Sequence, residues 1–179
     1  MSCDALLRVS EDAKPFSSGV IVDWYDGAVS GAARCANGEE AFAFRLVAWD
    51  DQQRRRIFVL RRLHPDQLSQ LESYVPMSSR TTADWSTLQG FASDAERDEA
   101  WRAANELLDR SSDVKYVVLA TDIATNVMAA TAVEREAERQ RVERMLLKQP
   151  SEEDGYVFSE DSFETWLALF SRDDLTTAN

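Results

Sequence analysis

Residues 19–63 read GVIVDWYDGAVSGAARCANGEEAFAFRLVAWDDQQRRRIFVLRRL and contain four apolar, β-rich runs separated by turn-forming residues. Asp26-Gly27 and Asn37-Gly38 separate the first three runs, and the polar stretch at residues 50–55 separates the last two. Asp-Gly and Asn-Gly supply the positive φ angles that tight hairpin turns require, and Val, Ile, Phe and Trp suit a pleated, half-buried surface. The segment therefore predicts an antiparallel meander of four strands.

The expected strands follow the apolar runs and cover residues 20–25, 28–35, 41–49 and 56–63. In the third run, alternate residues place apolar side chains on both faces, which predicts a sheet covered in part by helices. Residues 114–120 form an unbroken apolar run and are expected to be a fifth strand. Residues 1–18 are expected to be irregular, and the alternative is that residues 5–9 add an edge strand. These ranges predict a curled antiparallel sheet or a small barrel of four to five strands.

Three segments carry helical signals outside the strands. Pro65 suits the first position of a short helix that ends before the next proline. Ser93 and Glu96 form a capping-box pattern, which predicts a second helix with one buried stripe. A long third helix is expected from Ile123 to Lys148, with Ala, Val and Met in its first half and paired charges in its second half. With two to three helices packed on the sheet, residues 1–150 are predicted to form a single α+β domain.

The chain has 179 residues, with 32 acidic and 20 basic side chains and a formal net charge of −12. This charge disfavours nucleic acid and anionic membrane as partners and is compatible with a basic protein partner. The basic cluster at residues 54–62 is interpreted as protection of a sheet edge rather than as a phosphate site. The chain has neither the basic start of a signal peptide nor a window near the roughly 20 apolar residues of a membrane span. A cytoplasmic protein is therefore predicted.

Two cysteines, Cys3 and Cys35, and one histidine, His64, limit the redox and metal chemistry of the chain. Two cysteines do not make a disulfide framework, and a reducing cytoplasm is the simplest compartment for them. The ligands are too few for zinc, and the acidic pairs lack the spacing of a calcium loop, so no metal or cofactor is expected. His64 directly precedes a proline, and we interpret it as a loop contact or a helix cap rather than a catalytic base.

The run Asp23-Trp24-Tyr25-Asp26-Gly27 places two carboxylates beside two aromatic rings, which are the ingredients of a sugar site or a glycosidase pair. In the structural alternative, Asp26 belongs to the turn, Asp23 points outward from a strand, and Trp24 fills the core. No recognisable catalytic motif accompanies the run. A small enzyme that uses Asp23 or Asp26 with Tyr25 is therefore the secondary hypothesis.

Residues 151–179 form an acidic C-terminal segment with eight acidic residues and one basic residue, Arg172. Apolar residues recur there at helical spacing, which predicts a short amphipathic helix docked on the domain. Two roles are open for its aromatic stripe: the stripe packs on the chain's own sheet, or it anchors in a basic groove of a partner. The candidate partner-binding residues are Glu160, Asp161, Phe163, Glu164, Trp166 and Phe170.

Elimination leaves a non-enzymatic cytoplasmic protein-binding module as the leading hypothesis. An acidic inhibitor or immunity-type protein that caps a basic partner needs charge and shape but no catalytic motif. A third hypothesis is a structural subunit of a larger assembly, in which Trp85, Phe91 and the C-terminal stripe form subunit contacts.

Overall fold

The computed structural model describes residues 3–8, 14–80, 85–148 and 160–170. Its centre is a seven-stranded mixed sheet with the strand order β5-β1-β2-β3-β4-β6-β7. The strands are β1 (Phe16–Trp24), β2 (Ala28–Cys35), β3 (Ala41–Asp50), β4 (Arg55–Leu63), β5 (Trp85–Thr87), β6 (Val114–Asp122) and β7 (Asn126–Ala132). The described helices are α1 (Cys3–Arg8), α2 (Pro65–Tyr74), the 3-10 helix η1 (Met77–Ser79), α3 (Asp94–Asp109), α4 (Glu136–Leu147) and α5 (Glu160–Leu167).

The antiparallel meander predicted for residues 19–63 is confirmed. β1, β2, β3 and β4 pair with one another in sequence order. β2 has the predicted bounds, and the other three strands begin or end within a few residues of theirs. The backbone φ angles of Asp26, Gly27 and Gly38 are 48°, 132° and 77°, the positive values that the two turn motifs predict. The α+β class follows from this sheet and its helices.

The predicted strand count is wrong, because the sheet has seven strands rather than four or five and β5 and β7 at its two ends do not pair into a barrel. The predicted fifth strand is β6, which pairs with β4. β5 is only three residues long and runs parallel to β1, so the sheet is mixed rather than antiparallel. A strand this short leaves no periodic signal in the sequence.

The predicted helix from Ile123 to Lys148 is wrong in its first half, where the chain forms β7. Asp122 starts a tight turn after β6: its Oδ1 accepts a hydrogen bond from the Ala124 N–H at 2.8 Å. β7 then pairs antiparallel with β6. Alanine and methionine favour a helix, but pairing with a buried strand overrides that local preference. Only the charged second half is helical, as α4.

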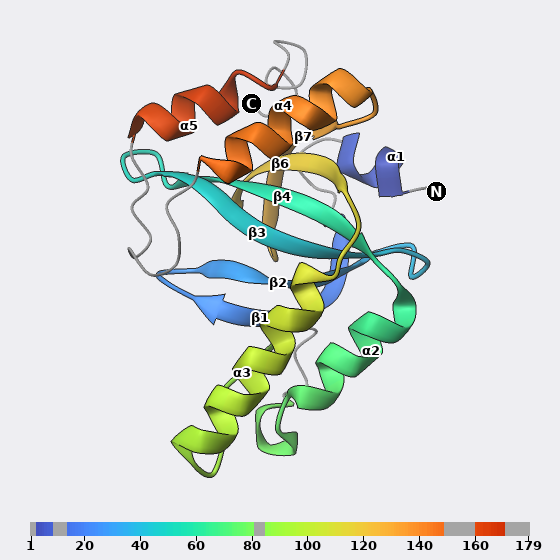
Figure 1. The fold of residues 1–179 in the computed structure, drawn as a ribbon, viewed down its shortest axis with the longest axis vertical. Coiled ribbons are helices and arrows are strands. Elements are labelled where there is room, and N and C mark those ends of the chain that lie inside the picture. Colours follow the sequence, from blue (N-terminus) through green and yellow to red (C-terminus); the bar gives the residue numbers. More distant parts are fainter. Residues whose placement is uncertain (1–2, 9–13, 81–84, 149–159, 171–179) are drawn as a thin grey trace.

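The two faces of the sheet are covered by different helices (Figure 1). On one face, Phe42, Phe44, Phe58 and Tyr116 belong to a core cluster that includes residues of α1. On the other face, α3 contacts β1 and pairs with α2, while α5 contacts β3 and β4 and α4 contacts β6. Alternate strand residues point to opposite faces, so both faces of the central strands are apolar, as the third run predicts.

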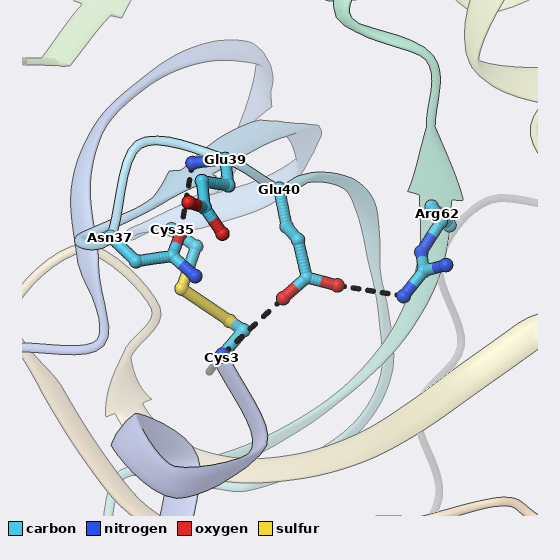
Figure 2. Close-up of a disulfide and its surroundings, with 6 residues drawn as sticks. All are labelled: Cys3, Cys35, Asn37, Glu39, Glu40 and Arg62. Carbon is cyan, nitrogen blue, oxygen red and sulfur yellow. Dashed lines mark hydrogen bonds and ion pairs between the residues drawn. A yellow bond between two sulfur atoms is a disulfide. The ribbon is translucent and has the colours of Figure 1, made fainter. Parts of the chain in front are cut away.

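The first residues differ from the prediction, because residues 3–8 form the helix α1 rather than irregular chain or an edge strand. Cys3 in α1 and Cys35 at the end of β2 form a disulfide, with their Cα atoms 6.1 Å apart (Figure 2). The expectation that the two cysteines make no disulfide is therefore wrong. They are 32 residues apart in the sequence, and no local pattern indicates that α1 packs back against the sheet.

The hairpin between β3 and β4 carries an ion pair that contacts α5. The Asp50 carboxylate accepts hydrogen bonds from Arg55 Nε at 3.2 Å and from Arg55 Nη2 at 2.8 Å. The Arg55 guanidinium lies 5.0 Å from the centre of the Phe163 ring in α5. The side-chain hydrogen bond from Arg55 lowers the pKa of Asp50 below its ordinary value of 3.8.

This lowered pKa predicts an acid-sensitive contribution to stability. A carboxyl whose pKa is lower in the folded state stabilises the fold above its unfolded pKa, and the contribution is lost as the pH falls through the folded pKa. We expect Asp50→Asn to reduce the loss of unfolding free energy between about pH 5 and about pH 2. Urea unfolding at a series of pH values, with an NMR titration of the Asp50 carboxyl, measures this effect. Parallel pH profiles for the two proteins would contradict it.

Candidate partner-binding surface

The turn between β1 and β2 exposes two neighbouring aromatic side chains. Trp24 is 55% exposed and Tyr25 is 64% exposed, whereas Asp23 is only partly exposed. The expectation that Trp24 fills the core is wrong, because its side chain is exposed, and Asp23, expected to point outward, is partly covered. The register of β1 against β2 shifts between Ile21 and Asp23 and again between Asp23 and Trp24. Such irregularities change which face a strand residue points to.

Asp23 is held by hydrogen bonds from two other elements. Trp101 Nε1 in α3 donates to Asp23 Oδ1 at 2.6 Å, and Ser30 Oγ in β2 donates to Asp23 Oδ2 at 2.7 Å. These contacts connect α3 to the first two strands. Asp26 lies in the exposed turn, where it adopts a positive φ angle. Asp23 therefore has a local structural role, and Asp26 belongs to the turn, as the structural alternative for this run predicts.

Arg56 of β4 fixes the backbone of the turn from inside the protein. Its side chain is buried, and Arg56 Nη1 donates to the Ala28 carbonyl at 3.3 Å. Nη2 donates to the carbonyl oxygens of Tyr25, at 3.5 Å, and Asp26. Within the turn, the Tyr25 N–H donates to the Gly27 carbonyl at 2.9 Å. The two exposed rings are therefore carried by a turn whose backbone is held in place.

Gly27 is required in this turn for two reasons. Its φ angle of 132° lies in a region that side chains with a Cβ rarely adopt. A Cβ at this position would also overlap the guanidinium of Arg56. The Asp-Gly pair therefore gives the turn its shape and leaves room for the arginine below it.

An aromatic ring also contacts the Arg56 guanidinium. The centre of the Trp49 ring lies 4.7 Å from Arg56 Cζ, and the Tyr25 and Trp49 rings meet edge to face with centroids 6.0 Å apart. Trp49 Nε1 is buried and has no hydrogen-bond partner among the described residues. Tyr25, Trp49 and Arg56 thus contact one another in series, and the cation of Arg56 lies over the Trp49 ring.

The charges at this end of the sheet are arranged with the cation inside and carboxylates nearer the surface. Burial lowers the pKa of Arg56, and the negative charges of Asp122 and Asp26 raise it. Asp26 is exposed and Asp122 is partly exposed, while the arginine is buried. We define the aromatic turn surface as Trp24, Tyr25, Asp26 and Asp122. Aromatic faces beside carboxylates are suited to bind a lysine or arginine side chain.

The aromatic stripe of α5 lies against the chain's own sheet. Phe163, Trp166 and Phe170 are buried in one core cluster with residues of β3, β4, β6 and β7. The sequence left two roles open for this stripe. In the described structure the stripe packs on the chain's own sheet. Glu164 is exposed on the outer side of the helix. Whether it contacts a partner stays a prediction.

Several acidic residues named in the sequence interpretation lie outside the described part of the chain. The structure does not describe the side chains of Glu160 and Asp161. It also does not describe residues 151–159 and 171–179, which contain the other acidic residues of the C-terminal segment apart from Glu164. The six candidate residues are thus divided among three core aromatics, one exposed acid and two side chains that are not described.

The remaining candidates pack or cap within the chain. His64 Nδ1 accepts a hydrogen bond from the Asp66 N–H at 3.3 Å at the start of α2, so its interpretation as a helix cap is confirmed. Trp85 packs against the core cluster that contains Phe44, with ring centroids 6.2 Å apart. Phe91 packs against the cluster under α2 and α3. Both rings named for the subunit hypothesis therefore make contacts inside this chain.

Comparisons of the chain with protein families, with curated proteins and with solved structures gave no match. In the part of the chain that the structure describes, no helix is long and apolar enough to cross a membrane. Among the same residues, no three His, Cys, Asp or Glu side chains are grouped so that they could hold a metal ion.

Proposed function

We propose that this protein is a non-enzymatic protein-binding module that uses the aromatic turn surface to bind a basic protein partner. Its most concrete form is an acidic inhibitor or immunity-type protein that works in the cytoplasm and caps that partner. One observation carries the proposal: the consecutive residues Trp24 and Tyr25 are both exposed where β1 enters a turn whose backbone Arg56 holds from below.

The energetics of interfaces support this use of the turn. Tryptophan and tyrosine are enriched among the few residues that carry most of the free energy of binding. Their rigid rings supply a large contact area and lose little conformational freedom on binding. Because Arg56 already fixes the turn, the partner does not have to order its backbone, which reduces the free-energy cost of association.

The charge of the chain supports a basic partner over a neutral one. The net charge of −12 attracts a cationic protein at long range, Asp26 offers a carboxylate next to Tyr25 in the turn, and Asp122 adds a negative charge that acts on Arg56. Exposed charges of this kind accelerate association and make it sensitive to salt. A partner lysine or arginine placed over Tyr25 would meet both the ring face and a carboxylate.

The double variant Trp24→Ala/Tyr25→Ala tests the proposal. We expect it to weaken the affinity for a basic partner, captured from native lysate with the wild-type protein, by at least about 30-fold, as for hot-spot residues worth about 2 kcal/mol. Its stability should change little, because both side chains are largely exposed in the free protein. Titration calorimetry at low salt measures the affinity, and circular dichroism checks the fold. Binding of the double variant with wild-type affinity would overturn the proposed surface.

Three single variants sharpen this experiment. Met77→Ala removes another large apolar side chain, 77% exposed but on η1, and should leave the affinity unchanged. Asp26→Asn should weaken binding and flatten its dependence on salt, because it removes one carboxylate of the surface. Glu164→Gln tests the separate expectation that α5 contacts the partner. Failure of any basic protein to bind saturably and with defined stoichiometry would reject the proposed function itself.

A further inference from the structure

α1 is a six-residue helix that lies against β7 and covers part of one sheet face (Figure 1). Cys3 and Leu7 belong to the core cluster on that face, and Leu6 packs against it. A helix of this length is not stable alone in water, because helix formation needs several turns to offset the cost of nucleation. The position of α1 therefore depends on its contacts with the sheet.

Cys3 carries the contacts that fix the first turn of α1 (Figure 2). Its sulfur is bonded to Cys35 at the end of β2. Its backbone N–H donates to Glu40 Oε2 at 3.3 Å, and Glu40 Oε1 accepts from Arg62 Nη2 in β4 at 2.7 Å. One covalent bond and one hydrogen bond thus join the start of α1 to the end of the sheet. Beyond Cys3, α1 contacts the core through the side chains of Leu6 and Leu7.

We propose that the Cys3–Cys35 disulfide is a redox-controlled latch that keeps α1 on the sheet. A dithiol reductant supplies two electrons and two protons: the sulfur–sulfur bond breaks, both cysteines become thiols, and the dithiol becomes a disulfide. α1 then separates from β7 and leaves the apolar core residues at that edge accessible to solvent. Reoxidation by a disulfide of a redox protein or of glutathione reverses the exchange and closes the latch.

The burial of the two cysteines determines how the latch opens. Both residues are 0% exposed, so a reductant reaches the sulfur atoms only through transient local opening of the chain around the disulfide. The rate of reduction should therefore rise with reductant concentration and then level off at the rate of opening. The disulfide should be reduced in the cytosol and formed outside the cell, because cytosolic systems keep thiols reduced and extracellular conditions keep disulfides formed. The inference does not depend on the proposed partner.

Backbone ¹⁵N NMR relaxation of the full chain, oxidised and then reduced with dithiothreitol, tests the latch. We expect the order parameters of residues 3–8 to fall from about 0.85, typical of rigid backbone, to below about 0.6, typical of flexible backbone. Chemical shifts should change in β7 and at the end of β2, whereas the turn between β1 and β2 should keep its shifts. Mass spectrometry after alkylation verifies that both thiols are free.

A variant that cannot form the bond makes the result independent of the reductant. Cys3→Ser/Cys35→Ser should show the same low order parameters in α1 without dithiothreitol, and oxidation of the wild-type protein should restore the high values. Order parameters that stay near about 0.85 after verified reduction would overturn the latch. A disulfide that resists dithiothreitol under native conditions would also overturn it. Partner affinity should be equal in both redox states, so this outcome is distinct from failure of the proposed function.

Discussion

Trp166→Ala is expected to reduce the free energy of unfolding by about 3–5 kcal/mol, the range for large aromatic residues removed from a core. Trp166 is 1% exposed and lies in the cluster that α4 and α5 form with the sheet. The substitution removes the transfer free energy of the ring and leaves a cavity that a sheet covered on both faces fills only in part. Urea unfolding followed by circular dichroism measures the loss.

Glu164→Ala is the matched control for this prediction. It lies in the same helix, two positions from Trp166, but its side chain is exposed. Alanine also favours the helical conformation, so the change should stay within about 0.5 kcal/mol of wild type. If Trp166→Ala cost less than about 1 kcal/mol, α5 would contribute no core to the fold. The free aromatic stripe would then return as the candidate anchor for a partner.

Arg56→Met is expected to reduce the free energy of unfolding by about 2–4 kcal/mol. Apolar replacement of a buried charge is often neutral when the charge sits in an ion pair. Here the direct partners of the guanidinium are the carbonyl oxygens of Ala28, Tyr25 and Asp26, and methionine cannot replace these hydrogen bonds. Hydrogen bonds to a charged group are worth about 1.5–3 kcal/mol each, so this loss exceeds the gain from removing a desolvated cation.

The same substitution should weaken partner binding although Trp24 and Tyr25 are retained, because the turn that carries them is no longer fixed. Arg62→Met is the control, since Arg62 lies in the same strand but makes an exposed ion pair with Glu40. Such pairs contribute about 1 kcal/mol or less. Equal urea midpoints for Arg56→Met and the wild-type protein would contradict the bracing role of this arginine.

The parts of the fold that the sequence predicts are those whose signals are local. The hairpins of residues 19–63 carry their turn residues and their apolar runs within the same short segment. β5 pairs with β1 across a long stretch of sequence, and β7 depends on pairing with β6 against its own helical preference. Single-sequence patterns show neither the long-range pairing of β5 nor the strand neighbour that overrides the helical preference of β7, so both strands and the place of α1 were missed.

The sequence indicated the segment that forms the candidate surface but not which of its side chains are exposed. The run at residues 23–27 is conspicuous because it combines two aromatics with two carboxylates and a turn. The irregular pairing of β1 with β2 decides which of these side chains is exposed, and a two-residue alternation rule does not anticipate it. Arg56 resembled one more surface arginine in a basic cluster. Its burial under the turn between β1 and β2 is a contact between segments distant in sequence.

The order of the strands has a consequence for the protein as it leaves the ribosome. The four strands of the meander are complete at Leu63, so they can pair while most of the chain is still being made. The face of β3 and β4 that α5 covers stays bare until Glu160–Leu167 emerges, after the intervening helices and strands. A nascent chain that carries an uncovered apolar sheet is a typical client of chaperones and a starting point for aggregation. α5 therefore ends the exposure of this sheet face.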